Sequence, residues 1–149
     1  ELKITSSEFS DGEKIPRKYG YTNDNINPPL KISGVPKETE SLVLIMDDPD
    51  AMGPAGKVWD HWVLWNISPD IELIREGKAP LWAEEGQNDY KKIGYGGPNP
   101  PDKEHTYIFK LYALDTKLDL KKGATKKDVE ESMKGHVIEK TKLTGTYAP

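Results

Sequence analysis

Three short apolar runs dominate the pattern of hydrophobic and polar positions along the chain. Residues 41–46 (SLVLIM), 62–67 (WVLWNI) and 107–114 (YIFKLYAL) are apolar almost throughout and are bounded by polar or turn residues. Runs of this length are typical of strands that are buried on both faces. We therefore predict that these three runs form strands at the centre of a sheet.

Only one segment has the periodicity of a helix. Thr125 precedes residues 126–140, in which apolar side chains recur on one helical face. These apolar residues are Val129, Met133 and Val137. A threonine at this position is a good helix cap, so the sequence predicts a helix over 126–140, with Gly135 as a possible earlier end. Residues 69–92 contain glycine and proline without sustained periodicity and are predicted to form loops.

Composition indicates one ordinary domain spanning residues 1–149. The chain contains no cysteine, which excludes disulfides, thiolate catalysis and cysteine-based zinc sites. Its net charge is -4, and residues of both signs are scattered, so we expect neither a nucleic-acid partner nor stable membrane insertion. The first residues do not resemble a signal peptide, and we expect a cytoplasmic protein.

The first chemical motif lies between the first two apolar runs. Asp48 and Asp50 flank a proline, and His61 follows at the start of the next run. If Asp48 approaches His61, its carboxylate would favour the imidazolium form and orient the ring towards a polar head group. Alternatively, the two aspartates only stabilise a turn and His61 packs at a strand end. Trp59 is placed to form an apolar rim.

The second motif, GYGGPNPPDKEHTY over residues 94–107, combines a stiff loop with the start of the third run. Its adjacent glycines allow backbone conformations closed to other residues, and its prolines predict a rigid wall, with a cis bond expected before Pro49 or Pro101. The wall comprises Pro98, Asn99, Pro100 and Pro101. His105 and Tyr107 are two apart and share one strand face. The alternative is a surface turn followed by a core tyrosine.

The order of these motifs resembles the phosphatidylethanolamine-binding protein (PEBP) family, in its bacterial and archaeal, Raf kinase inhibitor-like branch. The resemblance rests on DPD, HW with WNI, GYGGP, PP, H, Y and LYALD, and extends from SSEF and INPPL to GTY. It implies a mainly β protein, a two-sheet Greek-key β-sandwich with short peripheral helices, one near the C-terminus. It also implies a small anion-binding pocket. Family members are associated with phospholipid head groups, phosphorylated partners, kinase regulation and protease inhibition, and bacterial members imply a homodimer.

The resemblance places Asp48 and His61 on the family's pocket positions, and Asp50 also matches the motif, with turn stabilisation as an equal interpretation. We predict that His61, His105 and the Tyr107 hydroxyl act as donors and that Asp48 orients His61. The chain departs from the pattern in two places. Thr106 stands where many relatives have arginine, and Asn99 stands where the bacterial branch often has cysteine.

These observations predict a non-catalytic binding protein whose pocket accepts a phosphate-like or carboxylate-like group without a cofactor. One alternative is a regulatory inhibitor that acts on a kinase or a protease through its surface. Another is metal-assisted hydrolysis, for which Asp48, Asp50, His61 and His105 are candidate ligands. The chain has no HExxH, GxSxG or P-loop motif, which favours binding over catalysis.

Overall fold

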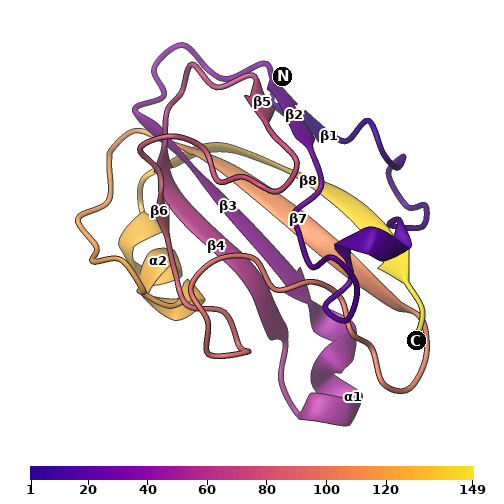
Figure 1. Ribbon diagram of the computed structural model, residues 1–149. Coiled ribbons are helices and arrows are strands. Elements are labelled where there is room, and N and C mark those ends of the chain that lie inside the picture. The colour runs from indigo at the N-terminus through magenta and orange to yellow at the C-terminus, as the bar shows by residue number, and fades with distance from the viewer.

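The computed structural model describes residues 1–149, and two antiparallel sheets packed face to face form most of it (Figure 1). The large sheet has the strand order β6 (Glu84–Glu85), β4 (Trp59–Ile67), β3 (Ser41–Asp48), β7 (His105–Leu114) and β8 (Val137–Tyr147). The small sheet has the order β1 (Lys3–Thr5), β2 (Leu30–Ser33) and β5 (Leu73–Ile74). The predicted fold class, mainly β with two sheets and short helices, is confirmed.

The three predicted strands form the middle of the large sheet and are longer than predicted. They correspond to β3, β4 and β7, and every residue of β3 is buried. Both faces of β3 are covered because the small sheet packs on one side and a helix on the other. Leu44 belongs to the core between the sheets, whereas Ile45 belongs to a second apolar cluster that includes Val129 and Met133 of the helix.

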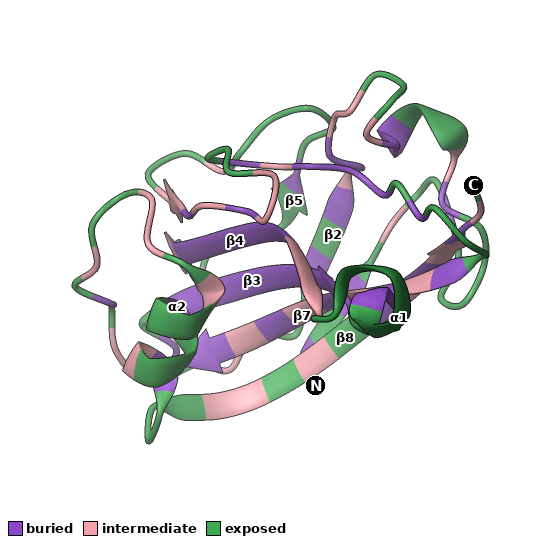
Figure 2. Cartoon of the chain, turned by 90° about the horizontal axis from the view of Figure 1, so that it is seen from below, coloured by how far each residue is buried: buried purple, intermediate pink, exposed green.

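The helices are short and lie at the periphery of the sheets (Figure 2). They are η1 (Arg17–Tyr19), η2 (Pro49–Ala51), α1 (Met52–Ala55) and α2 (Lys126–Met133). Thr125 caps α2 as predicted, in a reciprocal pair of hydrogen bonds with Asp128. The helix ends at Met133, before the left-handed Gly135 with φ of 81°, so the predicted extension to residue 140 is wrong. None of these helices has the length and apolar character needed to cross a membrane.

The loop predicted over residues 69–92 contains two strands of two residues each, β5 and β6. After β6 the chain crosses the end of β4 before it enters β7 on the other side of β3. Gly96 marks this crossing, since its N–H donates to the carbonyl oxygen of His61 at 2.9 Å. The second motif therefore folds over the same end of the large sheet at which the first motif leaves β3.

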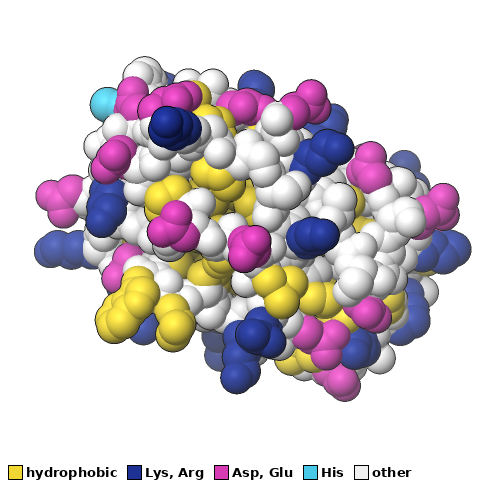
Figure 3. Space-filling view, turned by 90° about the horizontal axis from the view of Figure 1, so that it is seen from above, with side chains coloured by type: hydrophobic (Ala, Val, Ile, Leu, Met, Phe, Trp, Pro, Cys, Tyr) yellow, Lys and Arg dark blue, Asp and Glu magenta, His cyan; other side chains and the backbone are white.

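The face that carries the small sheet is a mixed, charged surface. Lysine, arginine and acidic side chains are interspersed on it, and hydrophobic side chains appear between them (Figure 3). The two most exposed large hydrophobic side chains of the chain are Leu81 and Trp82, which are 82% and 90% exposed. Both belong to the connection between β5 and β6.

Candidate functional site: a cavity at the end of the central strands

A cavity of about 290 Å³ lies where the ends of β3, β4 and β7 meet the glycine- and proline-rich loop. It brings together eight of the ten predicted site residues. Those from the strands are Asp48, Trp59, His61, His105 and Tyr107. Those from the loop are Asn99, Pro100 and Pro101. The two motifs therefore line one cavity.

Asp50 and Pro98 do not line the cavity. The Asp50 carboxylate accepts the N–H of Thr106 at 2.9 Å, and the Asp50 N–H donates to the Asp48 carboxylate at 2.9 Å. Asp50 therefore stabilises the turn after β3, which was the alternative interpretation of this residue. Pro98 is buried, and its carbonyl oxygen accepts the N–H of Tyr21 at 2.9 Å.

Asp48 pairs with His105, and the predicted approach of Asp48 to His61 is wrong. The Asp48 Oδ2 atom lies 2.6 Å from His105 Nδ1, and both side chains are almost fully buried. The pairing follows from strand order, because β3 lies beside β7 and its last residue reaches the first residue of that strand. The two motifs are thus joined by an ion pair at the base of the cavity.

A second carboxylate bonds the other side of the same ring. Asp102 Oδ1 lies 2.6 Å from His105 Nε2, and the Asp102 side chain is 41% exposed. A carboxylate accepts hydrogen bonds, so both ring nitrogens donate and His105 is an imidazolium. Burial lowers the pKa of His105, but its hydrogen bonds to the two aspartates outweigh burial and raise it. Because both N–H groups are engaged, His105 offers no free donor, contrary to its predicted role.

A β-bulge turns His61 towards the cavity. Met46 pairs with Trp62 and Asp47 pairs with Asp60, so His61 is an extra residue in β4. Asp60 then faces the helix α2, where it bonds Lys126 at 2.8 Å, and His61 faces the cavity. In a regular strand these two side chains would exchange faces.

His61 is neutral rather than cationic. Its Nδ1 atom lies 2.7 Å from the carbonyl oxygen of Gly96, which can only accept, so Nδ1 carries the proton. Burial lowers the pKa of His61 to about 4. With the proton on Nδ1, the Nε2 atom carries a lone pair. His61 is therefore an acceptor, which corrects its prediction as a cationic donor.

Two of the buried donors that have no hydrogen-bond partner belong to residues that line the cavity. They are the hydroxyl group of Tyr107 and the indole Nε1–H of Trp59. Burial raises the pKa of Tyr107, so its hydroxyl group stays protonated at neutral pH. Buried polar groups normally have partners, so two free donors at one cavity mark a place for an acceptor.

Gly96 and Gly97 of the loop are required because other residues approach their Cα atoms closely, and not because their backbone angles are unusual. A Cβ on Gly96 would lie 2.4 Å from the ring of Tyr90, and a Cβ on Gly97 would lie 2.1 Å from the carbonyl oxygen of Tyr19. Neither glycine has a positive φ, so the predicted conformational reason for both is wrong. All peptide bonds are trans, and the cis bond predicted before Pro49 or Pro101 is absent.

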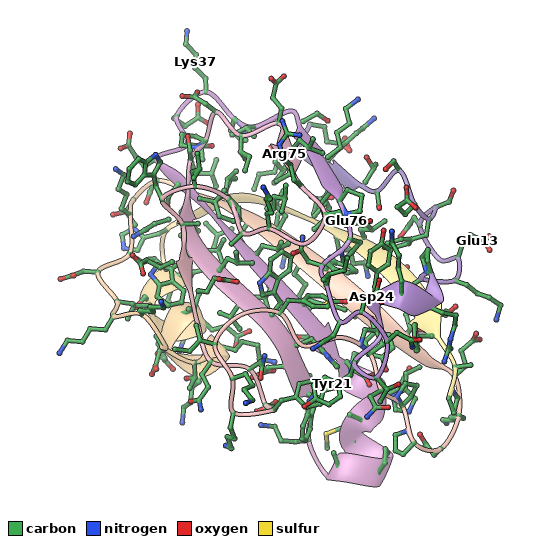
Figure 4. All side chains as sticks on the ribbon, in the orientation of Figure 1. Glu13, Tyr21, Asp24, Lys37, Arg75 and Glu76 are labelled. Atoms are coloured by element: carbon green, nitrogen blue, oxygen red, sulfur yellow. The ribbon has the colours of Figure 1, made fainter.

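Sequence reasoning missed Tyr90 and three small residues of the cavity lining, Ala51, Pro54 and Ala55, and it missed Asp102, which bonds His105. Tyr90 lines the cavity, donates to the carbonyl oxygen of Gly97 at 2.7 Å and stacks on Tyr21 with ring centroids 3.9 Å apart. Figure 4 shows Tyr21 at the end of the molecule where α1 lies. Tyr90 comes from a segment without hydrophobic periodicity or a motif, so no signal in the sequence indicated that it belongs to the site. Asp102 lies three residues before His105, and this spacing was a usable signal.

The four candidate metal ligands named from the sequence do not form a ligand set in the structure. Asp48 and His105 bond each other, Asp50 bonds the backbone, and His61 bonds the loop. No group of three or more histidine, aspartate or glutamate side chains is arranged to hold a metal ion.

Comparison with known proteins establishes the family. Residues 5–148, which include both motifs, match the sequence pattern described as phosphatidylethanolamine-binding protein. The chain belongs to the phosphatidylethanolamine-binding protein family. It is 47% identical over 151 residues to a UPF0098 protein of Methanothermobacter thermautotrophicus, with 98% of both chains covered. It is 43% identical over 148 residues to a UPF0098 protein of Chlamydia trachomatis, again with 98% of both chains covered.

Two solved structures of PEBP relatives share the fold of this PEBP-family chain. A PEBP homologue from Chlamydia trachomatis superposes with a TM-score of 0.93 at 42% identity, covering 98% of this chain and 96% of that one. YbcL of Escherichia coli, described as a member of the mammalian PEBP family, superposes with a TM-score of 0.90 at 31% identity. That match covers 98% of this chain and 97% of YbcL. The two-sheet architecture is therefore that of the PEBP family.

Proposed function

We propose that this protein binds a small oxyanionic group, phosphate-like or carboxylate-like, in the cavity and that it does so without catalysis. The observation that carries the proposal is the pair of unpartnered donors, the Tyr107 hydroxyl and the Trp59 indole N–H, at one cavity. An oxyanion supplies several acceptor oxygens and would satisfy both donors at once. A hydrogen bond to a charged group stabilises a complex by about 1.5–3 kcal/mol.

The lone pair on His61 Nε2 adds a preference for a ligand that also donates. A hydrogen phosphate monoester has this polarity, since its P–OH group would donate to His61 while its other oxygens accept from Tyr107 and Trp59. The family name refers to phosphatidylethanolamine, whose head group contains a phosphodiester. Phosphate ester chemistry is common to both ligands, and the experiment below compares them.

Calorimetry with soluble probes tests the proposal. Methyl phosphate, glycerophosphoethanolamine and acetate represent a phosphate monoester, the head group and a carboxylate. Tyr107→Phe removes one donor with little change in shape, and we expect it to weaken binding of the preferred probe by roughly tenfold or more. Tyr112→Phe is the matched control, because Tyr112 lies on the opposite face of β7 and does not line the cavity. We expect it to bind as the native protein does.

Three results would contradict the proposal. One is the absence of binding for all three probes. Another is equal affinity of Tyr107→Phe and Tyr112→Phe, which would leave the free donor without a role. The third is turnover of an activated phosphate ester by the native protein that His61→Asn abolishes, because this would make the cavity a catalytic site.

A further inference from the structure

β8 is the border strand of the large sheet, and part of its outer edge is unpaired (Figure 2). Residues 11–15 cover the far end of this edge by hydrogen bonds to the backbone of Thr144 and Thr146. In an antiparallel pair, alternate residues point their backbone groups away from the partner strand. Lys140 and Lys142 therefore point their N–H and C=O groups to the same edge as Thr144. No other segment hydrogen-bonds to these two residues there.

The side chains beside this free edge are cationic. Lys142 lies directly opposite Lys110 of β7, and Lys140 follows two residues along the same face of β8. Like charges directly opposite each other destabilise a sheet. Lys110 forms an ion pair with Asp47 at 2.9 Å, whereas Lys140 and Lys142 are exposed and form no ion pair within the chain. A hollow of about 460 Å³ lies among these lysines, and no acidic side chain lines it.

The other side of the edge is also hollow. A groove of about 370 Å³ lies between β8 and β1, bordered by Lys3 and, at its end, by Asp11. Lysines on an edge strand often serve only to prevent edge-to-edge pairing. Here the free backbone groups, the hollows on both sides and the uncompensated positive charge together leave room for an additional strand.

We propose that the free edge of β8 at Lys140–Lys142 docks an extended acidic segment of a partner protein. The segment would add a strand to the large sheet by hydrogen bonds to the backbone of both lysines. Side chains of a strand alternate between faces, so acidic residues at every second position would face Lys140 and Lys142. The partner segment would therefore have the sequence pattern acidic residue, β-forming residue, acidic residue. This surface is separate from the cavity residues and does not depend on their ligand.

A labelled peptide tests this proposal by fluorescence anisotropy at low ionic strength. The probe is Thr-Glu-Val-Glu-Val-Glu-Thr, which combines alternating carboxylates with strand-forming residues. Its control, Thr-Glu-Pro-Glu-Pro-Glu-Thr, has the same charge, but its prolines fix φ at about −65°, away from the extended values of a β-strand. We expect the valine peptide to bind at least roughly tenfold more tightly than the proline peptide. We also expect slower hydrogen exchange at the amides of Lys140 and Lys142 in the complex.

A charge-reversed pair locates the site. Lys140→Glu/Lys142→Glu should weaken binding of the valine peptide by roughly tenfold or more, whereas Lys121→Glu/Lys122→Glu makes the same change in net charge elsewhere and should have little effect. Equal binding of both peptides would reduce the interaction to non-specific charge attraction and overturn the proposal. Equal loss in both reversed variants, or unchanged exchange at Lys140 and Lys142, would also overturn it.

Discussion

The carboxylate of Asp48 and the imidazolium of His105 form a buried ion pair, 2.6 Å apart, that joins the end of β3 to the start of β7. Asp102, in the loop that precedes β7, bonds the remaining ring nitrogen, and its Oδ1 atom lies 2.6 Å from His105 Nε2. Two carboxylates around one imidazolium leave one net negative charge beside the cavity. Asp102 thus occupies the place on His105 that an oxyanion would take.

Removal of the Asp102 carboxylate is expected to strengthen oxyanion binding. Asp102→Ala frees the Nε2–H of His105 as a donor and removes a negative charge next to the ligand. Each of these effects favours the anion, and we expect affinity for methanesulfonate, a permanently charged probe, to rise by roughly fivefold or more in calorimetry.

Asp119→Ala is the matched control, since Asp119 is exposed, lies outside the cavity and makes the same change in net charge. An equal gain in both variants would indicate a general charge effect. A loss of affinity in Asp102→Ala would mean that Asp102 holds His105 in place for the ligand, which would contradict competition between Asp102 and the ligand.

The neutral form of His61 makes stability depend on pH. The pKa of His61 is about 4 in the folded chain, against an ordinary value of 6.5. Between these values the unfolded chain binds more protons, so this contribution is fully present above pH 6.5 and is lost as pH falls towards 4. A difference of this size corresponds to roughly 3 kcal/mol in the free energy of unfolding.

Urea unfolding at pH 7.5 and 4.5 measures this effect. His61→Asn is the comparison because its amide can still donate to the Gly96 carbonyl but does not titrate. We expect the free energy of unfolding to fall by roughly 2–3 kcal/mol more in the native protein than in His61→Asn between the two pH values. His105 titrates in both proteins and cancels in the comparison. Equal decreases would contradict a buried neutral His61.

Elements with a strong local signal were predictable from the sequence. β3 contains a continuous apolar run, which matches the burial of both its faces, and Thr125 caps α2 by contacts within one turn. β8 was missed because one of its faces is exposed and polar, and its first residues continue the helical pattern of α2. Gly135 decides between helix and strand there, since its left-handed φ of 81° ends the helical path.

The residue types of the site were predictable, but their pairing was not. His61 and His105 both lie near the carboxylates and turns of the two motifs. Because His61 is nearer to Asp48 along the chain, the sequence predicts that these two residues pair. Strand order decides otherwise, because β3 lies beside β7 as well as β4. The bulge that turns His61 into the cavity depends on the register of β3 and β4, which no local pattern records. Asp48 and Asp50 illustrate the same limit, because two carboxylates of one turn serve different partners.

A side chain at Gly96 is expected to destabilise the loop and weaken the site. The Cβ of Gly96→Ala would lie 2.4 Å from the Tyr90 ring, so the loop must shift and the hydrogen bond to His61 must lengthen. We expect a loss of roughly 1–3 kcal/mol in the free energy of unfolding together with weaker oxyanion binding. Gly53→Ala is the control, because a Cβ there meets nothing within 4 Å. Similar results for both alanine variants would mean that the loop is not held against Tyr90.

Lys126 is expected to stabilise the end of β3 from the side opposite the cavity. Its Nζ atom lies 2.8 Å from Asp60 and 3.2 Å from Asp47, whose side chain is 1% exposed. Lys126→Met keeps the apolar stem but leaves both carboxylates with less compensation, and losing one partner of a buried pair typically costs 3–5 kcal/mol. Asp47 retains Lys110 at 2.9 Å, so we expect a loss of roughly 2–4 kcal/mol in the free energy of unfolding, measured with urea at pH 7.

Lys127→Met is the control. It changes the next, exposed lysine of α2 and should alter the free energy of unfolding by less than about 0.5 kcal/mol. Equal stability of the two variants would show that solvent compensates Asp47 and Asp60, and that packing alone holds α2 against the sheet.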